Sequence, residues 1–347
     1  MRVWKKIARS NFVIKLKAWE YWPFGILQLP VIIYWLWLSL KARSPFFFSA
    51  SNPGIDMGGM FGESKYEVLK KVPQQYVPTT VLAEIPITTE KVQKILQANR
   101  IQLPVIFKPD LGERGFMVKK IRDADDISDY LQEIKVSFII QELVDLPFEF
   151  GIFYTRFPDE DRGRVTSVVM KEMLTVTGDG TSTLKDLILA KDRAKLQWRN
   201  LKIAFRDRLM EILPQGKQLE LVSIGNHALG TKFLDGSHLI NDKLSSVFDQ
   251  ISKQIDGFYF GRYDLRCQSI EDLYQGNIRI LELNGCGAEP AHIYEPGYDI
   301  RKALQVLFTH WKNIYVIAQQ NRRRGVKYVS LDHAYRFYKK FKDATTP

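Results

Sequence analysis

The 347-residue sequence is poor in cysteine, with only Cys267 and Cys286. A disulfide framework is therefore excluded, and two reduced thiols in the cytosol are a simpler interpretation than one bridge. The sequence also lacks the GxxxxGK[ST] phosphate loop and the GxGxxG dinucleotide fingerprint. It shows no internal repeat and no low-complexity tract. We expect no cleavable signal peptide, because the apolar run starts late and no small-residue cleavage site stands out.

Acidic residues are nearly absent from the first 48 positions, where Glu20 stands against eight basic residues. This stretch therefore carries +7 of the formal net charge of +11, and a second basic cluster, QNRRRGVKY and YRFYKKFK, closes the chain. Basic clusters of this kind are one feature of proteins that bind nucleic acid. We do not expect nucleic acid here, because the basic residues flank an apolar segment and no nucleic-acid module is visible.

That apolar segment, residues 21–40, contains no charged side chain. Twenty such residues suffice to cross a bilayer as a helix, and tryptophans lie toward both ends. A buried core helix is the alternative. Pro23 and Pro30 interrupt a plain span, and the basic flanks oppose translocation. We expect a monotopic or re-entrant anchor on the cytoplasmic face of a membrane with anionic lipid, and expect deletion of residues 1–48 to release a soluble body.

With 45% hydrophobic and 26% charged residues, the chain has the composition of a folded protein with room for two or three lobes. From about Tyr66 onward, helical and extended patterns alternate and predict an α+β protein. Strands are expected at LPVIFKPD, VSFIIQEL and RVTSVVMKEMLTV. Helices are expected at KYEVLKKV, TTEKVQKILQAN, DISDYLQEI, SSVFDQISKQI and DIRKALQVLFTHWKNIYVIAQQN, with a helix-rich stretch after STLKDL.

Two further strands, GRYDLRC at 261–267 and IRILELN at 278–284, carry charge where a buried strand should not. Alternation places Arg262 and Asp264 on one face of the first strand, and Glu282 and Asn284 on one face of the second, with Leu281 and Leu283 opposite. A hairpin with one wet face would look the same. The other interpretation is a Mg²⁺ site, because Mg²⁺ binds carboxylate and amide oxygens together with substrate phosphates. The rest of the chain decides between these two interpretations.

The stretch LPVIFKPDLGERGFMVKKI ends a strand at Lys108 and continues into a loop with Gly112 and Gly115. Glycines let backbone amides approach phosphates, and lysine adds a point charge. Taken alone, a glycine hairpin beside a surface lysine looks the same.

Together these stretches resemble the ATP-grasp carboxylate–amine ligases, nearest in pattern to D-alanine–D-alanine ligase, with features of the cyanophycin-synthetase and glutathione-synthetase-like branches. GESKYEVLKKVPQQYVPTT resembles the opening of the ATP-binding lobe, PVIFKPDLGERGFMV the glycine loop, IIQELVDLPFEF the hinge, and GRYDLRC with ILELNGCG the metal strands. VSIGNHALGTKFLDGS places Asn226 and Gly230 at family positions. The match runs from about Gly62 to Gly287, and the order of its pieces favours the Mg²⁺ interpretation.

The resemblance implies a two-lobed ATP-grasp fold and assigns roles to individual residues. The phosphates of ATP are expected to contact Lys65, Lys108 and Lys171, together with the loop glycines Gly112 and Gly115. The adenine is expected to lie near Glu142, Leu143 and Val144. The ribose hydroxyls are expected to bind Glu149. Arg262 steadies the acyl phosphate, and two Mg²⁺ ions fall to Asp264, Glu282 and Asn284. The expected divisions are residues 1–50 (membrane segment), 51–140 and 141–320 (the two lobes), and 321–347 (basic tail).

The implied reaction uses Mg·ATP to convert a carboxylate to an acyl phosphate, which an amine then attacks. The chain departs from the family in lacking room for the usual first α/β domain, and in NGCGAEP replacing the family's N..PG ending. An amine- or carboxylate-bearing lipid is therefore one hypothesis for a substrate. Cys286 is expected to be a small buried cysteine. His292 is expected to be a structural histidine, and a histidine that faces the acceptor is the alternative. The alternatives are a non-ligase enzyme of the same fold (a kinase or thiol ligase) and a catalytically silent membrane-bound scaffold.

Overall fold

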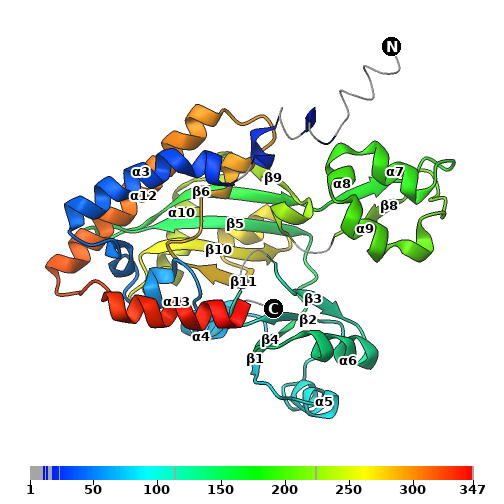
Figure 1. Cartoon of the computed structure of the whole chain (residues 1–347), viewed down its shortest axis with the longest axis horizontal. Coiled ribbons are helices and arrows are strands. Elements are labelled where there is room, and N and C mark those ends of the chain that lie inside the picture. Colours follow the sequence, from blue (N-terminus) through cyan, green and yellow to red (C-terminus); the bar gives the residue numbers. More distant parts are fainter. Residues whose placement is uncertain are drawn as a thin grey trace.

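The structure is a computed structural model that describes residues 11, 13–14, 18–22, 24–112, 115–222 and 225–345. It is a mixed α/β protein whose sheets are antiparallel, as Figure 1 shows. A four-stranded sheet has the order β1-β4-β2-β3, and a five-stranded sheet has the order β11-β10-β5-β6-β9. A third, two-stranded sheet pairs β7 with β8. The mixture of helices and antiparallel sheets agrees with the α+β prediction.

The four-stranded sheet forms a small lobe with helices on one face. Its strands are β1 (Thr80–Ala83), β2 (Val105–Pro109), β3 (Lys119–Ile121) and β4 (Phe138–Glu142), and the helices are α5 (Thr89–Ala98) and α6 (Ala124–Glu133). Val105 and Phe107 point into the core with the helices, whereas Ile106 and Lys108 face the other way because strand side chains alternate. The open face of this lobe is thereby available to line a cavity.

The five-stranded sheet is the centre of the molecule. Its strands are β5 (Phe148–Thr155), β6 (Arg164–Glu172), β9 (Lys232–Asp235), β10 (Phe260–Cys267) and β11 (Ile278–Asn284). One face packs on α4 (Lys65–Lys71), α10 (Asp242–Lys253) and α11 (Ile270–Gln275). The other face is divided: Phe153 and Phe260 lie under α12 (Ile300–Arg323), whereas the polar side chains nearer the small lobe are left uncovered.

The apolar segment near the N-terminus forms α3 (Phe24–Ala42), which lies along α12 in Figure 1. Its inner face is buried with Leu27, Val31 and Leu38, and its outer face is exposed. Among the described residues, no helix is both long and apolar enough to cross a membrane. The predicted anchor thus belongs in part to the folded body, and the membrane contact stays a prediction.

Two parts of the chain differ from the sequence-based expectation. RVTSVVMKEMLTV forms two strands rather than one, β6 and β7 (Thr175–Thr177), and β7 leaves the main sheet to pair with β8 (Gln218–Glu220). These short strands and the helices α7 (Leu184–Ala190), α8 (Asp192–Leu196) and α9 (Trp198–Ala204) enclose a separate small core. The basic tail forms α13 (Leu331–Thr345), whose Phe337 and Phe341 contact Phe61.

Candidate functional site

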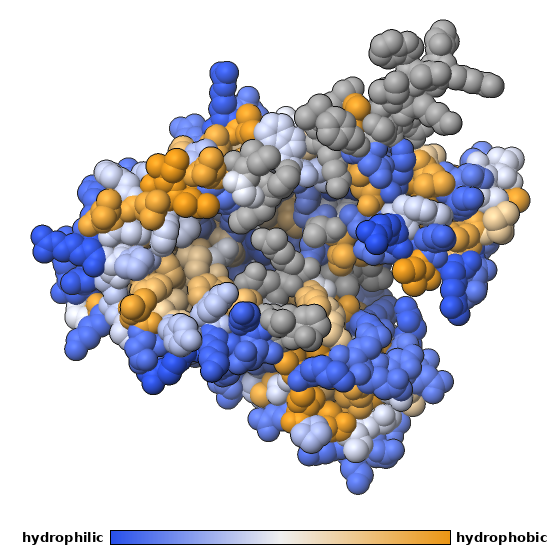
Figure 2. All heavy atoms as spheres, in the orientation of Figure 1, coloured by the Kyte–Doolittle hydropathy of each residue, from blue (hydrophilic) through white to orange (hydrophobic). Residues whose placement is uncertain are grey.

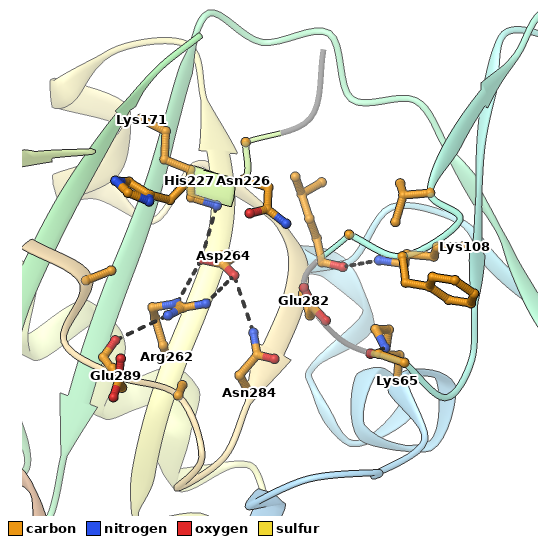
Figure 3. Close-up of a pocket in the computed structure, with 18 of the residues that line it drawn as sticks. Lys65, Lys108, Lys171, Asn226, His227, Arg262, Asp264, Glu282, Asn284 and Glu289 are labelled. Atoms are coloured by element: carbon orange, nitrogen blue, oxygen red, sulfur yellow. Dashed lines mark hydrogen bonds and ion pairs between the residues drawn. The ribbon is translucent and has the colours of Figure 1, made fainter. Parts of the chain in front are cut away.

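A cavity of about 750 Å³ is lined by residues of both larger sheets. Every predicted site residue lines it: Lys65, Lys108, Gly112, Gly115, Glu142, Leu143, Val144, Glu149, Lys171, Arg262, Asp264, Glu282 and Asn284. Asn226 also lines the cavity. Figure 3 shows the lysines, carboxylates and Arg262 converging on the same space from strands of both sheets, from the start of α4 and from the loop after β11. The structure therefore brings these residues together, whereas Gly230 is not among the described residues that line the cavity, and the role of each residue stays a prediction.

The floor of the cavity is set by the strand register. Asp264 lies opposite Glu282 and Arg262 lies opposite Asn284 across the β10–β11 pair. On its other side, Asp264 lies opposite Gly151 of β5. A side chain at Gly151 would meet Val169 Cγ1 at 2.6 Å and both Arg262 and Asp264 at 3.2 Å. The glycine thus leaves the room that the charged pair occupies, a feature the sequence did not reveal.

A chain of alternating charges crosses this floor. Arg262 donates two hydrogen bonds of 3.1 Å to the two carboxylate oxygens of Asp264, and Lys171 Nζ lies 3.0 Å from Glu149 Oε1 and 3.4 Å from Asp264 Oδ1. Arg266 closes the chain on Glu149 at 2.8 Å. Burial opposes ionisation of Asp264, but Arg262 and Lys171 outweigh it and hold the pKa of Asp264 below its usual range. Burial likewise opposes the charge on Lys171, whereas Asp264 and Glu149 raise its pKa overall.

A β-bulge shapes the next part of the site. The register steps from Asp264–Glu282 to Leu265–Ile280, so Leu281 has no partner on β10. Its carbonyl oxygen accepts hydrogen bonds from Lys108 Nζ at 3.0 Å and from Gln141 Nε2 at 3.3 Å. Leu281 is half-buried and Leu283 is buried, and both border the cavity, so the shared face of these two side chains stays a prediction.

Two lysines on the side of the small lobe donate hydrogen bonds to uncharged oxygen atoms. Lys108 is buried, and its ammonium donates to Gln141 Oε1 at 3.1 Å and to the Leu281 carbonyl. Lys65 begins α4, and its ammonium donates to the carbonyl oxygens of Gly112 and Asp110. No carboxylate lies within ion-pair distance of either ammonium in the part of the chain that the structure describes. Both charges are therefore available to an anion in the cavity.

The glycine loop lies over the cavity and meets the opposite side. Gly115 has φ +74°, which favours glycine, and a side chain there would come within 2.8 Å of Asn226 Nδ2. The loop from the small lobe and the segment at Asn226 thus touch above the floor. Glu142, Leu143 and Val144 border the same space at the end of β4, beside the apolar side chains of Ile106, Val118 and Leu281.

The Glu282 carboxylate faces the cavity without a hydrogen bond or ion pair to any described residue. Asn284 donates its amide to Asp264 Oδ2 at 3.3 Å, so its carbonyl oxygen remains for another partner. These two oxygens suit Mg²⁺, which takes few protein ligands when phosphates supply the rest. Asp264 suits the ion less well here because Arg262 holds both of its oxygens. No group of three or more His, Cys, Asp or Glu side chains that could hold a metal occurs among the described residues.

The remaining reactive side chains lie apart from this chemistry. Cys286 is buried, and burial raises the pKa of its thiol to about 12, as expected for a structural cysteine. His292 is also buried, with Nδ1 2.6 Å from Ser167 Oγ, and it is not among the described residues that line the cavity. Among the described histidines, His227 lines the cavity, and no sequence pattern singled it out.

No protein-family model and no curated protein matches the chain. Among solved structures, it is similar to a bifunctional glutathione synthetase from Pasteurella multocida (13% identity, 71% of this chain and 36% of that one, TM-score 0.35). It is also similar to VanG D-Ala:D-Ser ligase from Enterococcus faecalis (16% identity, 74% of this chain and 62% of that one, TM-score 0.39). A third similar structure is D-alanine–D-alanine ligase from Bacillus anthracis (10% identity, 76% of this chain and 69% of that one, TM-score 0.41). The chain spans about a third of the length of the glutathione synthetase and less than two thirds of the length of the VanG ligase.

Proposed function

We propose that the protein is an ATP-dependent ligase that activates a carboxylate as an acyl phosphate and joins it to an amine. The observation that carries the proposal is the pair of ammonium groups of Lys65 and Lys108, which face the cavity opposite the Glu282 carboxylate. A magnesium nucleotide matches this arrangement of charges, because its phosphates are attracted to the two ammonium groups and its Mg²⁺ is attracted to the carboxylate. The resemblance of the sequence to ATP-grasp ligases supports the same assignment.

In this reaction a substrate carboxylate oxygen attacks the γ-phosphorus of ATP, and ADP leaves. The amine nitrogen then attacks the acyl carbon, phosphate leaves, and the amine loses a proton to water. Both steps place negative charge near Arg262, whose guanidinium is already oriented by Asp264 and by the Glu289 carbonyl at 3.2 Å. Glu282 and Asn284 would hold Mg²⁺, which when bound neutralises charge on the phosphates. The adenine would lie between Ile106 and Leu281.

Nucleotide binding tests the lysine assignment. We expect Lys108→Ala to weaken binding of a non-hydrolysable ATP analogue by roughly tenfold or more, because it removes a desolvated charge from the phosphates. Lys119→Ala is the matched control, since Lys119 pairs with Glu133 at 2.6 Å on the surface of the same lobe. Equal losses from the two variants, measured by calorimetry, would remove the phosphate assignment.

We propose further that the protein works on a membrane surface with anionic lipid. The outer face of α3 exposes an apolar patch at helical spacing, made of Leu29, Ile32, Ile33, Leu36, Trp37 and Leu40. Figure 2 shows hydrophobic atoms gathered over this helix. Lys41 and Arg43 follow the patch, and α12 beside it exposes Arg301, Lys302 and Lys312. An apolar face flanked by cations suits insertion into the interface of an anionic bilayer.

Sedimentation with vesicles of phosphatidylcholine and phosphatidylserine tests this second proposal. We expect the full-length protein to pellet with the vesicles, and the double variant Ile33→Ser/Leu36→Ser to stay largely in the supernatant. Leu331→Ser is the control, because Leu331 is 74% exposed on α13, away from the patch. Wild-type protein that stays in the supernatant, or a double variant that changes only the oligomeric state, would show that the patch serves another partner.

A further inference from the structure

Beyond Arg262 the cavity continues into a space bordered by five rings: Trp19, Tyr21, His227, Phe233 and Tyr294, here called the aromatic compartment. The ring of Tyr294 lies 5.8 Å from that of Trp19 and 5.7 Å from that of His227, which in turn stacks on Tyr21 at 5.9 Å. Phe233 meets His227 at 5.4 Å. The rings come from three distant parts of the sequence, so the compartment is a product of the fold.

The wall formed by residues 19–21 is tied to the body on both sides. Glu20 and Arg193 of α8 form an ion pair in which the Glu20 side chain is only 3% exposed. The Trp19 indole nitrogen donates to the Tyr298 carbonyl oxygen at 2.6 Å. These contacts hold the segment against the cavity.

One carboxylate stands at the entrance of the aromatic compartment. Glu289 accepts hydrogen bonds from Gln28 of α3 and from the Tyr294 hydroxyl, which fix its orientation. Figure 3 shows Glu289 beside Arg262. In the proposed function, Arg262 is the residue that stabilises the activated carboxylate. Burial lowers the pKa of His227 to about 4, so this ring is neutral at pH 7 and does not repel a cation.

We propose that the aromatic compartment binds the amine substrate, with its ammonium on Glu289 and an attached aromatic or other apolar group among the rings. An ammonium is attracted both to a carboxylate and to the faces of neighbouring rings, and an apolar group is stabilised by burial among them. This inference rests on the proposed function for the identity of the second substrate as an amine. It names the class: a primary amine that carries a ring or hydrocarbon group.

Three small probes separate the two parts of the recognition: phenethylamine has ring and ammonium, ethylamine has the ammonium alone, and phenylacetate has the ring with the opposite charge. Saturation-transfer NMR on the full-length protein gives their dissociation constants. We expect phenethylamine to bind roughly tenfold tighter than either of the others. Equal affinity for phenethylamine and phenylacetate would overturn the proposal.

Variants assign the two parts to residues. Glu289→Gln should lower the affinity for phenethylamine roughly tenfold and leave that for phenylacetate unchanged. Trp19→Ala should weaken both ring-bearing probes and spare ethylamine, whereas the control Trp37→Ala, on the outer face of α3, should change nothing. If Trp19→Ala lowers the melting temperature, Trp19→Phe serves in its place, with a smaller loss expected. An unchanged preference in Glu289→Gln, or equal effects of the Trp19 and Trp37 variants, would contradict the assignment.

These measurements need no ATP. If the amine probes do not bind as expected, the ATP proposal is unaffected. If Lys108→Ala and Lys119→Ala lose nucleotide affinity equally, the ATP proposal fails and the amine site is unaffected.

Discussion

At the scale of single residues, the charge of Lys108 depends on pH near neutrality. Burial, opposed by the nearby Glu282 carboxylate, lowers the pKa of Lys108 to about 8. The ammonium is therefore mostly charged at pH 7 and mostly neutral at pH 9. We expect affinity for a non-hydrolysable ATP analogue to fall as the pH rises above 8, by at most about tenfold per pH unit. Lys108→Met should bind weakly and remove this dependence. A flat wild-type profile from pH 7 to pH 9.5 would contradict the role of Lys108.

Glu282 and Asp264 share the predicted Mg²⁺ role, but their surroundings differ. Glu282 has no partner among the described residues, so Glu282→Gln should abolish turnover, by at least ~10²-fold, with an unchanged melting temperature. Asp264 holds Arg262 and Lys171, so Asp264→Asn would leave buried cations poorly compensated, at a cost of about 3 kcal/mol of unfolding free energy. Thermal melts beside activity assays distinguish the two. A destabilised Glu282→Gln or a fully stable Asp264→Asn would show that the ion pairs are assigned wrongly.

The residues of the site were largely predictable, because each lies in a local pattern of strand, loop or helix start. Gly151, Arg266 and Glu289 were not. Gly151 and Arg266 reach the site only through the register of β5 against β10, and Glu289 through the turn after β11. The β5–β10 pairing joins residues more than a hundred positions apart, and a single sequence contains no local signal for it.

At the scale of elements, the segment before Gly54 is part of the core. Phe47 is fully buried, and its ring contacts Phe48, Trp311 and Tyr315. Deleting residues 1–48 would expose this cluster, so we expect the truncated chain to aggregate rather than to form the soluble body that the sequence alone predicts.

A point variant measures the same packing. Phe47→Ala should destabilise the protein by about 3–5 kcal/mol, because it opens a cavity between α12 and the sheet. Tyr335→Ala, at a side chain that is 66% exposed, is the control and should change stability little. Denaturant unfolding of both variants provides the comparison, and similar stabilities would mean that the N-terminal segment is only loosely attached.

Local patterns located most helices and the strands β2, β4, β10 and β11, but not β5, the middle strand of the main sheet. FEFGIFYT is apolar on both faces except at Glu149 and at the final Thr155, so it shows no alternation to mark it as a strand. The amphipathic character of α3 was likewise hidden, because nearly all its side chains are apolar and only packing against α12 distinguishes its two faces.

At the scale of the whole molecule, one cavity joins three features that the sequence presents separately. The glycine loop and its lysines border one end, the carboxylate and Arg262 floor lies in the middle, and residues 19–22 close the other end. The N-terminal apolar segment thus contributes both to the cavity and, through the outer face of α3, to the surface. This continuity is what links the proposed chemistry to a membrane-borne or apolar substrate.

The most direct measurement is the mass balance of the reaction. The full-length protein would be incubated with ATP, Mg²⁺ and a fractionated extract of metabolites and lipids, and products would be identified by mass spectrometry beside the nucleotides. We expect a product whose mass is the sum of a carboxylate and an amine less one water, formed with one ADP and one phosphate per molecule, and absent with Glu282→Gln. A phosphorylated product, a thioester, AMP with pyrophosphate, or no ATP consumption with any fraction would contradict a carboxylate–amine ligase.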